Sequence, residues 1–156
     1  MLATLIIIAQ SFFGTLPIDG IHCDAVEGSV EHIHVQLWLF NRGRPRTVPA
    51  QIGMPQTGSC LYWIHTHSAD GIIHIESPIH RTFTLGQFFD IWGPDLSRTQ
   101  ADGVTARRGR GLSIWVNGVP WHGRDPRDIV LRDRETIVVQ NGPPFAKPGR
   151  TDWSKF

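Results

Sequence analysis

Residues 60–76 decide the expected fold; they read Cys60-Leu-Tyr-Trp-Ile-His-Thr-His67, Ser68-Ala-Asp-Gly71 and Ile72-Ile-His-Ile-Glu76. The two outer parts are rich in residues that favour β-strands. The middle part has the composition of a tight turn, in which Gly71 can adopt a positive φ. The stretch therefore predicts a β-hairpin with strands at 60–67 and 72–76.

Strand-forming stretches also lie on both sides of this hairpin. Residues 32–40 alternate for part of their length and predict a strand, preceded at 17–31 by a lead-in loop with at most one turn of helix. After a turn, residues 46–52 are expected to return as a second strand, which Pro49 restricts to an edge or an end. Downstream, short strands are expected at 112–116, 128–131 and 136–140.

One segment has the pattern of a helix: Thr84-Leu-Gly-Gln-Phe-Phe-Asp-Ile-Trp-Gly93. Thr84 and Gln87 have the spacing of a capping box, the apolar residues recur at intervals of three and four, and Gly93 is expected to end the helix. This order of elements predicts an α+β fold with a small mixed β-sheet and one amphipathic helix, in a β-grasp-like arrangement. A small all-β sandwich or barrel is the alternative.

Length and composition limit the organisation of the chain. With 156 residues, of which 40% are hydrophobic, it is long enough for one ordinary core. We therefore expect a single domain over residues 17–145 and an extended, proline-rich tail at 146–156. The formal net charge is +1, so no charge excess indicates binding to nucleic acid or to an anionic membrane surface.

The N-terminus and the two cysteines favour export. Residues 1–16 begin with an apolar run that is shorter than the roughly 20 residues needed to span a bilayer. We interpret them as a signal or membrane-anchor remnant that lacks the usual basic start; an apolar first strand is the alternative. Cys23 and Cys60 are expected to form a disulfide in an exported protein. Two buried thiols, or one thiol acting as a metal ligand, are the alternatives.

The histidines carry the strongest functional signal. In a β-strand, residues i and i+2 point to the same face of the sheet. Three pairs of metal donors have this spacing: His32 with His34, His65 with His67, and His74 with Glu76. Nitrogen and oxygen donors brought together in this way suit a divalent transition metal, copper or zinc. The alternative is a hydrogen-bonded polar core without metal.

The candidate ligands differ in strength. The best are His65, His67 and His74, because one hairpin carries all three, and His32 and His34 come next. Glu76 is expected to be a ligand or to orient an imidazole. Glu27 and Asp70 are weaker candidates for the same role. The remaining histidines have no partner on the same face and are interpreted as bystanders: His22, His80 and His122.

Several of these motifs resemble a family of small, uncharacterised, mostly exported bacterial and archaeal proteins. The matching segments cover most of residues 17–145 and are Pro17–Ile21, His32-x-His34, Val48–Gly53, Cys60–His67, Asp70–Pro78 and Thr82–Gly93. The resemblance implies export and the histidine set, but it names no reaction. Ser68 departs from the family pattern, which usually has an aspartate there, and this puts a role for that carboxylate in doubt.

These observations lead to three functional hypotheses. The first is an extracytoplasmic protein that binds copper or zinc for capture, buffering or delivery to a metal-receiving protein, with membrane anchoring through the N-terminus as an option. The second is a metal-dependent enzyme, an oxygenase or a hydrolase, that uses the same histidines. The third is an interaction module with structural histidines. The sequence contains no phosphate-binding loop, nucleophile elbow or His-Glu-x-x-His helix, so no catalytic residue is predicted.

Overall fold

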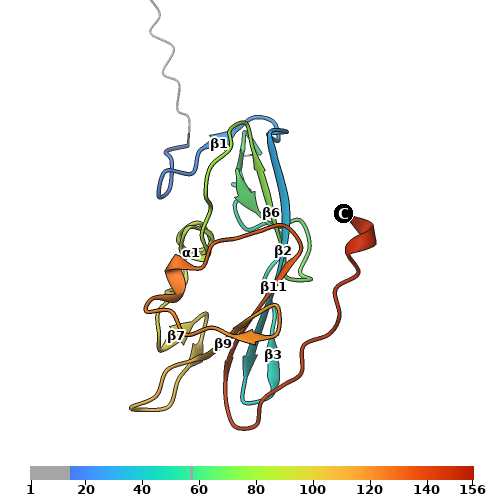
Figure 1. Ribbon diagram of the computed structural model, residues 1–156. Coiled ribbons are helices and arrows are strands. Elements are labelled where there is room, and N and C mark those ends of the chain that lie inside the picture. Colours follow the sequence, from blue (N-terminus) through green and yellow to red (C-terminus); the bar gives the residue numbers. More distant parts are fainter. Residues whose placement is uncertain (1–14, 57) are drawn as a thin grey trace, which may run out of the picture.

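A mixed β-sheet forms the centre of the molecule in the computed structural model, which describes residues 15–56 and 58–156 (Figure 1). Among these residues the sheet has seven strands: six follow the order β10-β9-β11-β2-β6-β5, and β3 pairs with β2. Their bounds are β2 Glu31–Asn41, β3 Arg44–Arg46, β5 Ile64–His65, β6 Ile72–Ser77, β9 Ser113–Val116, β10 Val119–Pro120 and β11 Glu135–Asn141. The long strand β2 pairs with β11 in parallel and with β6 in antiparallel orientation.

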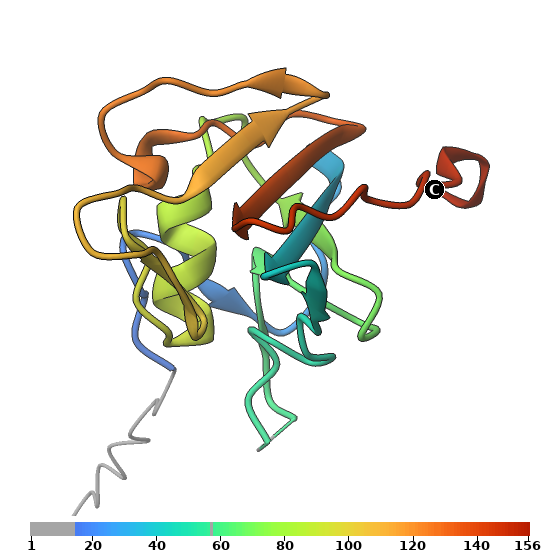
Figure 2. The ribbon, with the colours of Figure 1, turned by 90° about the horizontal axis from the view of Figure 1, so that it is seen from below.

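The helix α1, Leu85–Trp92, covers one face of this sheet (Figure 2). It begins as predicted, with a capping box between Thr84 and Gln87, and ends at Gly93 in the left-handed conformation. Phe88 and Phe89 are fully buried against the sheet. The core also contains the alternate residues of β2 that face the helix: Val35, Leu37 and Leu39. The structure therefore confirms a β-rich α+β fold, with a mixed sheet and one short α-helix among residues 15–56 and 58–156.

Two smaller strand pairs flank the main sheet. Strand β1, Cys23–Asp24, pairs with β4, Leu61–Tyr62, and β7, Gln100–Ala101, pairs with β8, Val104–Thr105. The predicted disulfide between Cys23 and Cys60 is formed beside the β1–β4 pair. The alternatives for the two cysteines, free buried thiols and a thiol ligand, are thereby excluded.

The predicted hairpin at 60–76 is only partly correct. Its second strand is β6, but the predicted first strand is divided into β4, which pairs with β1, and β5, which pairs with β6. Trp63 lies at the bend between them, and its indole Nε1 donates a hydrogen bond to Asp24 at 2.6 Å. His67 follows β5 and lies outside any strand.

Three other local predictions were wrong. The strand that returns after β2 is Arg44–Arg46 and not 46–52, because Gln51 and Gly53 have positive φ values that interrupt an extended strand. Residues 128–131 form no strand: Asp128 ends the 3-10 helix η1, Pro126–Asp128, and Val130 makes only an isolated bridge to Thr84. Residues 17–31 were predicted as a loop, but they contain the two-residue strand β1, which pairs with β4; the helical turn that the prediction allowed is not formed.

The C-terminal tail lies on the face of β2 that points away from α1 (Figures 1 and 2). The hydroxyl of Thr151 donates a hydrogen bond to Gln36 at 3.0 Å, and the ring of Phe156 lies 4.8 Å from that of His34. The tail was predicted to be extended, but it contains a short 3-10 helix, η2, Trp153–Lys155. The histidine-bearing face of the sheet is thus partly covered by the tail.

The segment 1–16, interpreted as a signal or anchor remnant, lies outside the described residues except for residues 15 and 16. Within the described part of the chain, no helix has the length and apolar character required to cross a membrane.

Candidate metal centre

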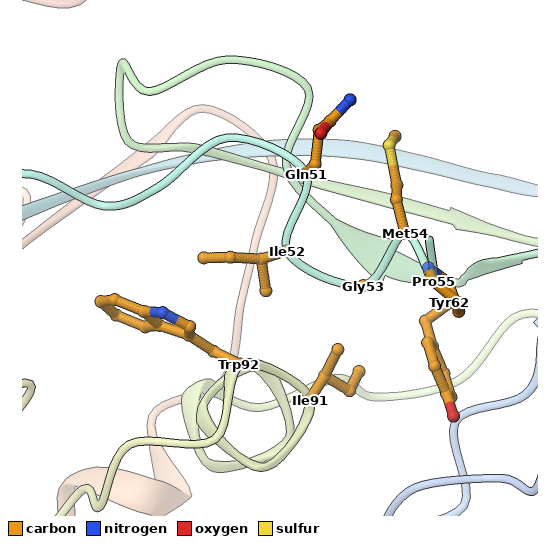
Figure 3. Close-up of a pocket in the computed structure, with 8 residues that line it drawn as sticks. All are labelled: Gln51, Ile52, Gly53, Met54, Pro55, Tyr62, Ile91 and Trp92. Atoms are coloured by element: carbon orange, nitrogen blue, oxygen red, sulfur yellow. The ribbon is translucent and has the colours of Figure 1, made fainter. Parts of the chain in front are cut away.

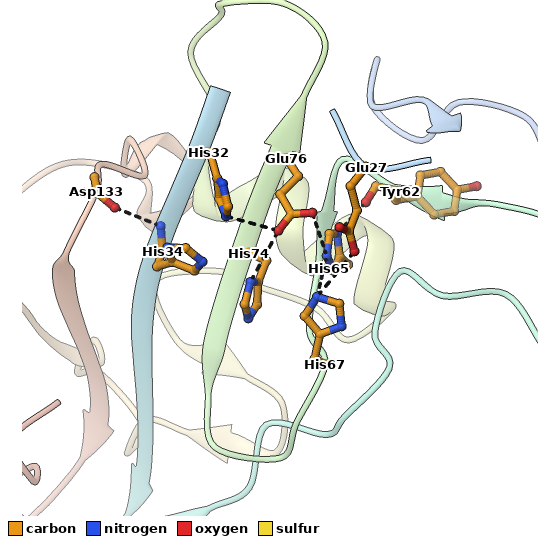
Figure 4. A network of polar contacts seen from close by, with 9 residues as sticks. All are labelled: Glu27, His32, His34, Tyr62, His65, His67, His74, Glu76 and Asp133. Carbon is orange, nitrogen blue, oxygen red and sulfur yellow. Dashed lines mark hydrogen bonds and ion pairs between the residues drawn. The ribbon is translucent and has the colours of Figure 1, made fainter. Parts of the chain in front are cut away.

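The strand register brings the predicted donors together on one face of the sheet (Figure 4). Between β2 and β6, His34 lies opposite His74 and His32 lies opposite Glu76. Strand β6 pairs with β5 along its other edge, and there His65 lies opposite His74. One row of imidazoles therefore crosses three adjacent strands. The intervening residues Ile73 and Ile75 face the hydrophobic core, which fixes the histidines on the opposite face.

Four of these side chains form the first donor group: His65, His67, His74 and Glu76. One ligand atom from each lies within 4.8 Å of all the others. The Nε2 atoms of His65 and His67 are 3.2 Å apart, and His65 Nε2 is 3.8 Å from Glu76 Oε2. Two donors bound to one tetrahedral zinc ion at about 2.0–2.1 Å would lie about 3.3–3.4 Å apart. The spacing therefore fits one ion after small side-chain movements.

The backbone selects the tautomer of His65. Its Nδ1 lies 2.9 Å from the carbonyl oxygen of Tyr62 and donates a hydrogen bond to it, because a carbonyl can only accept. In the neutral ring the lone pair is then on Nε2, the atom that points towards His67 and Glu76. A hydrogen bond from the outer nitrogen to a carbonyl is the usual way in which a metal-binding histidine is oriented.

Two buried polar atoms in this group have no hydrogen-bond partner among the described residues: Nδ1 of His74 and Oε2 of Glu76. Leaving a buried polar atom unpaired costs about 1–3 kcal/mol, and more for a charged group. Nδ1 of His74 is 3.7 Å from Glu76 Oε1, which is too long for a hydrogen bond. A cation between these atoms would satisfy both, so the donor set fits a metal ion.

A second donor group shares Glu76 with the first and consists of His32, His34 and Glu76. Nε2 of His32 lies 3.4 Å from Glu76 Oε1, and the rings of His32 and His34 are 4.8 Å apart. His34 is held in place by its backbone, whose N–H donates to Asp133 at 3.1 Å. His32 is the exposed member, with 59% of its side chain accessible.

Burial keeps the inner imidazoles neutral. Desolvation, reinforced by the neighbouring histidines, lowers the pKa of His74 to about 3. Burial likewise lowers the pKa of His65 to about 4, against the opposing effect of the Tyr62 carbonyl, and it lowers the pKa of His34. Burial and the nearby carboxylate of Glu27 raise the pKa of Glu76. Neutral imidazole is the form that binds metals, so no proton has to leave the inner rings at pH 7.

The weaker candidates separate into two kinds. Glu27 lies at the edge of the site, with Oε1 3.9 Å from His67 Nε2 (Figure 4). Asp70 instead belongs to the turn before β6, where its side chain accepts a hydrogen bond from the N–H of Ile72 at 3.0 Å.

Neither donor group includes the three predicted bystanders. His22 stacks on Trp63, His80 bonds to Glu31, and His122 is exposed.

Sequence reasoning did not find three neighbours of the site. Tyr62 contributes only a backbone carbonyl and Asp133 accepts from a backbone N–H, so neither role leaves a side-chain motif in the sequence. Phe156 packs against His34 and, at 5.9 Å between ring centroids, against His74. It belongs to the tail, for which the sequence gives no pairing signal.

Two cavities lie near the site. One of about 270 Å³ lies between residues 51–55 and the end of α1, with Ile52, Tyr62 and Trp92 in its wall (Figure 3). The other, of about 550 Å³, is lined by residues that include Glu27, Gln51 and Met54. The larger cavity therefore reaches Glu27, whose Oε1 is 3.9 Å from His67 Nε2 of the first donor group.

Comparison of the chain with protein-family models, with curated proteins and with solved structures found no match. The class of the protein therefore rests on its own geometry. It is a disulfide-containing, β-rich α+β domain in which histidines from β2, β6 and the β5 region form two donor groups around one glutamate.

Proposed function

We propose that this protein binds a divalent transition metal, copper or zinc, through the first donor group, for capture, buffering or delivery. The observation that carries the proposal is the pair of unpaired buried atoms, His74 Nδ1 and Glu76 Oε2, beside the oriented Nε2 of His65. Three imidazoles and one carboxylate are the donors that zinc and copper favour, whereas magnesium and calcium favour oxygen ligands. Four protein donors also saturate a tetrahedral ion, which favours holding the metal over catalysis.

We further propose that the protein acts outside the cytoplasm. The Cys23–Cys60 disulfide supports this location, since such bonds persist in oxidising compartments. The apolar start of the chain and the resemblance to a family of exported proteins point in the same direction. A buffering or delivery role implies a partner that receives the metal.

The β-grasp arrangement is also a proposal, and the topology supports it. Strands β2 and β6 form an antiparallel pair before α1, and β9 and β11 follow the helix. Strand β11 then lies between β9 and β2, parallel to β2, so the first and last long strands are central neighbours.

The test is metal analysis of protein purified without an affinity tag, followed by titration of the metal-free protein with Zn²⁺ and Cu²⁺. The wild-type protein should bind metal stoichiometrically, and replacing His65, His67 and His74 together by alanine should abolish this binding. The matched control removes three histidines outside the donor groups: His22, His80 and His122. Circular dichroism checks that both variants fold. Equal metal affinity in the wild type and the first variant would refute the proposal.

A metal-dependent enzyme, a hydrolase or an oxygenase, is the second candidate function. It is favoured by the cavity of about 550 Å³ that Glu27 lines, because a substrate in that cavity would contact Glu27, whose carboxylate is 3.9 Å from His67 Nε2. Turnover of a chromogenic ester or phosphate by the zinc-loaded protein, lost in Glu27→Gln while zinc affinity is retained, would favour a hydrolase. Metal binding without turnover favours the first function.

A further inference from the structure

Glu76 presents its two carboxylate oxygens to different histidines. Oε2 faces His65 at 3.8 Å, within the first donor group. Oε1 lies between the two groups, 3.4 Å from His32 Nε2 in the group that also contains His34 and 3.7 Å from His74 Nδ1 in the first group. The register explains this division, because Glu76 lies on the central strand β6 while His32 and His65 lie on the strands to either side. The carboxylate thus stands between two sets of nitrogen donors.

We propose that the protein binds two metal ions, one in each donor group, bridged by the carboxylate of Glu76. The inference rests on the proposed function, because it adds a second ion to the site described there. The described residues offer six donor side chains in two groups that share Glu76: five imidazoles and one carboxylate. A single zinc ion takes four ligands, so it would leave two imidazoles of the cluster unused. Two ions about 3.5–4 Å apart are a recurrent arrangement in metal sites of this kind.

The second ion would differ from the first in its surroundings. Its donors are two histidines and one shared carboxylate, so a position remains open for water, hydroxide or a small oxyanion. His32 lies at the solvent side, with 59% of its side chain exposed, whereas His65 on the other side is fully buried. His67 of the first group is also exposed, with 42% of its side chain accessible, but that group has two further inner imidazoles, His65 and His74, so its ion would be the more enclosed of the two.

Charge also limits the arrangement. Two divalent ions at this distance repel each other, and only anionic ligands between or beside them reduce the repulsion. Glu76 occupies the position between the two groups, and Glu27 lies beside His67 at 3.9 Å. We therefore expect the second ion to bind more weakly than the first, at higher metal concentration.

Metal stoichiometry tests the inference. Titration of metal-free protein with Zn²⁺ should reach two ions per chain in the wild type and one in His32→Ala/His34→Ala, with the affinity of the remaining ion within about threefold of the first wild-type ion. Removing two histidines outside both groups, in His80→Ala/His122→Ala, should leave two ions. Because His32 is largely exposed, the single variant His32→Ala provides the same test with little risk to the fold.

Copper distinguishes a bridged pair from two separate ions. With two equivalents of Cu²⁺, the paramagnetic resonance signal of the wild-type protein should be broadened or lost through coupling of the two spins. The signal in His32→Ala/His34→Ala should be that of an isolated ion. Two bound ions with uncoupled signals would refute the inference that Glu76 bridges them.

The outcomes separate this inference from the proposed function. One ion in the wild type, lost in the His65, His67 and His74 variant but unchanged in His32→Ala/His34→Ala, would overturn the inference and leave the proposed function standing. One ion lost only in His32→Ala/His34→Ala would overturn both, as would the absence of any bound ion.

Discussion

Acid should destabilise the metal-free protein through its two most buried imidazoles. In the folded protein the pKa of His65 is about 4 and that of His74 about 3, whereas an unfolded histidine titrates near pH 6.5. Below pH 6.5 the unfolded chain therefore binds protons that the folded protein does not. Stability rises with pH wherever the unfolded state binds more protons. This contribution is complete above pH 6.5 and is lost as the pH falls towards 4.

The structure gives the size of the effect. Each such proton changes the free energy of unfolding by about 1.4 kcal/mol per pH unit, so the two histidines together contribute about 2.7 kcal/mol per unit. Glu76 acts in the opposite direction, because its raised pKa lets the folded protein take up a proton at a higher pH than the unfolded chain. This offsets at most one proton. Between pH 6.5 and 5 we therefore expect a loss of about 2–4 kcal/mol.

The measurement is urea denaturation of metal-free protein at several pH values between 7 and 4.5, followed by tryptophan fluorescence. His74→Gln removes one titrating group and should reduce the slope of stability against pH by about 1.4 kcal/mol per unit. The control is His122→Gln, at an exposed residue outside both donor groups, which checks that loss of a histidine elsewhere does not by itself reproduce the effect. Stability that does not change over this range, or a wild-type slope in His74→Gln, would refute the reasoning.

Three further predictions concern the framework of the site, each measured by urea denaturation. Replacing Cys23 and Cys60 by alanine should cost about 4 kcal/mol, because the crosslink spans a sequence separation of 37 residues; a loss under about 1 kcal/mol would contradict this. Gly53→Ala should lower the free energy of unfolding clearly more than Gly118→Ala. Both glycines have a positive φ, but only at Gly53 would an added Cβ meet the backbone, 2.5 Å from the carbonyl oxygen of Ile64. Equal losses of stability would show that this contact is easily relieved. Thr84→Ala should cost about 1 kcal/mol through loss of the helix cap, and no change would mean that Gln87 caps α1 alone.

Features that depend on near neighbours in the sequence could be predicted. The helix α1 was correct at both ends, because its cap, its apolar face and its terminal glycine all lie within ten residues. The pairs His32 with His34 and His74 with Glu76 share a face, because a strand repeats every two residues. The apolar run at 129–131 was wrongly predicted as a strand. Ile129 and Leu131 are buried in the core without belonging to a strand, and an apolar pattern alone cannot distinguish a buried strand from a buried loop.

Features that depend on pairing between distant segments could not be predicted. Nothing near His34 in the sequence indicates that it lies opposite His74, or that Phe156 packs on its ring. The division of the predicted 60–67 strand has the same origin, since β4 pairs with β1 and β5 with β6. The sequence could therefore name the donors, but the two groups around Glu76 follow from the register of three strands.

The position of β11 has a consequence for the order of events during biosynthesis. Strand β2 lies between β6 and β11, and the hydrogen bond from His34 to Asp133 joins residues 99 positions apart. Contacts of such separation form late, because the loop-closure entropy is lost before the pairing compensates for it. A nascent chain that has not yet released β11 has no parallel partner for the strand that carries His32 and His34. The framework of the second donor group, which needs His32 and His34 beside Glu76, is therefore complete only after nearly the whole domain has been synthesised, whereas the members of the first donor group all lie within residues 65–76.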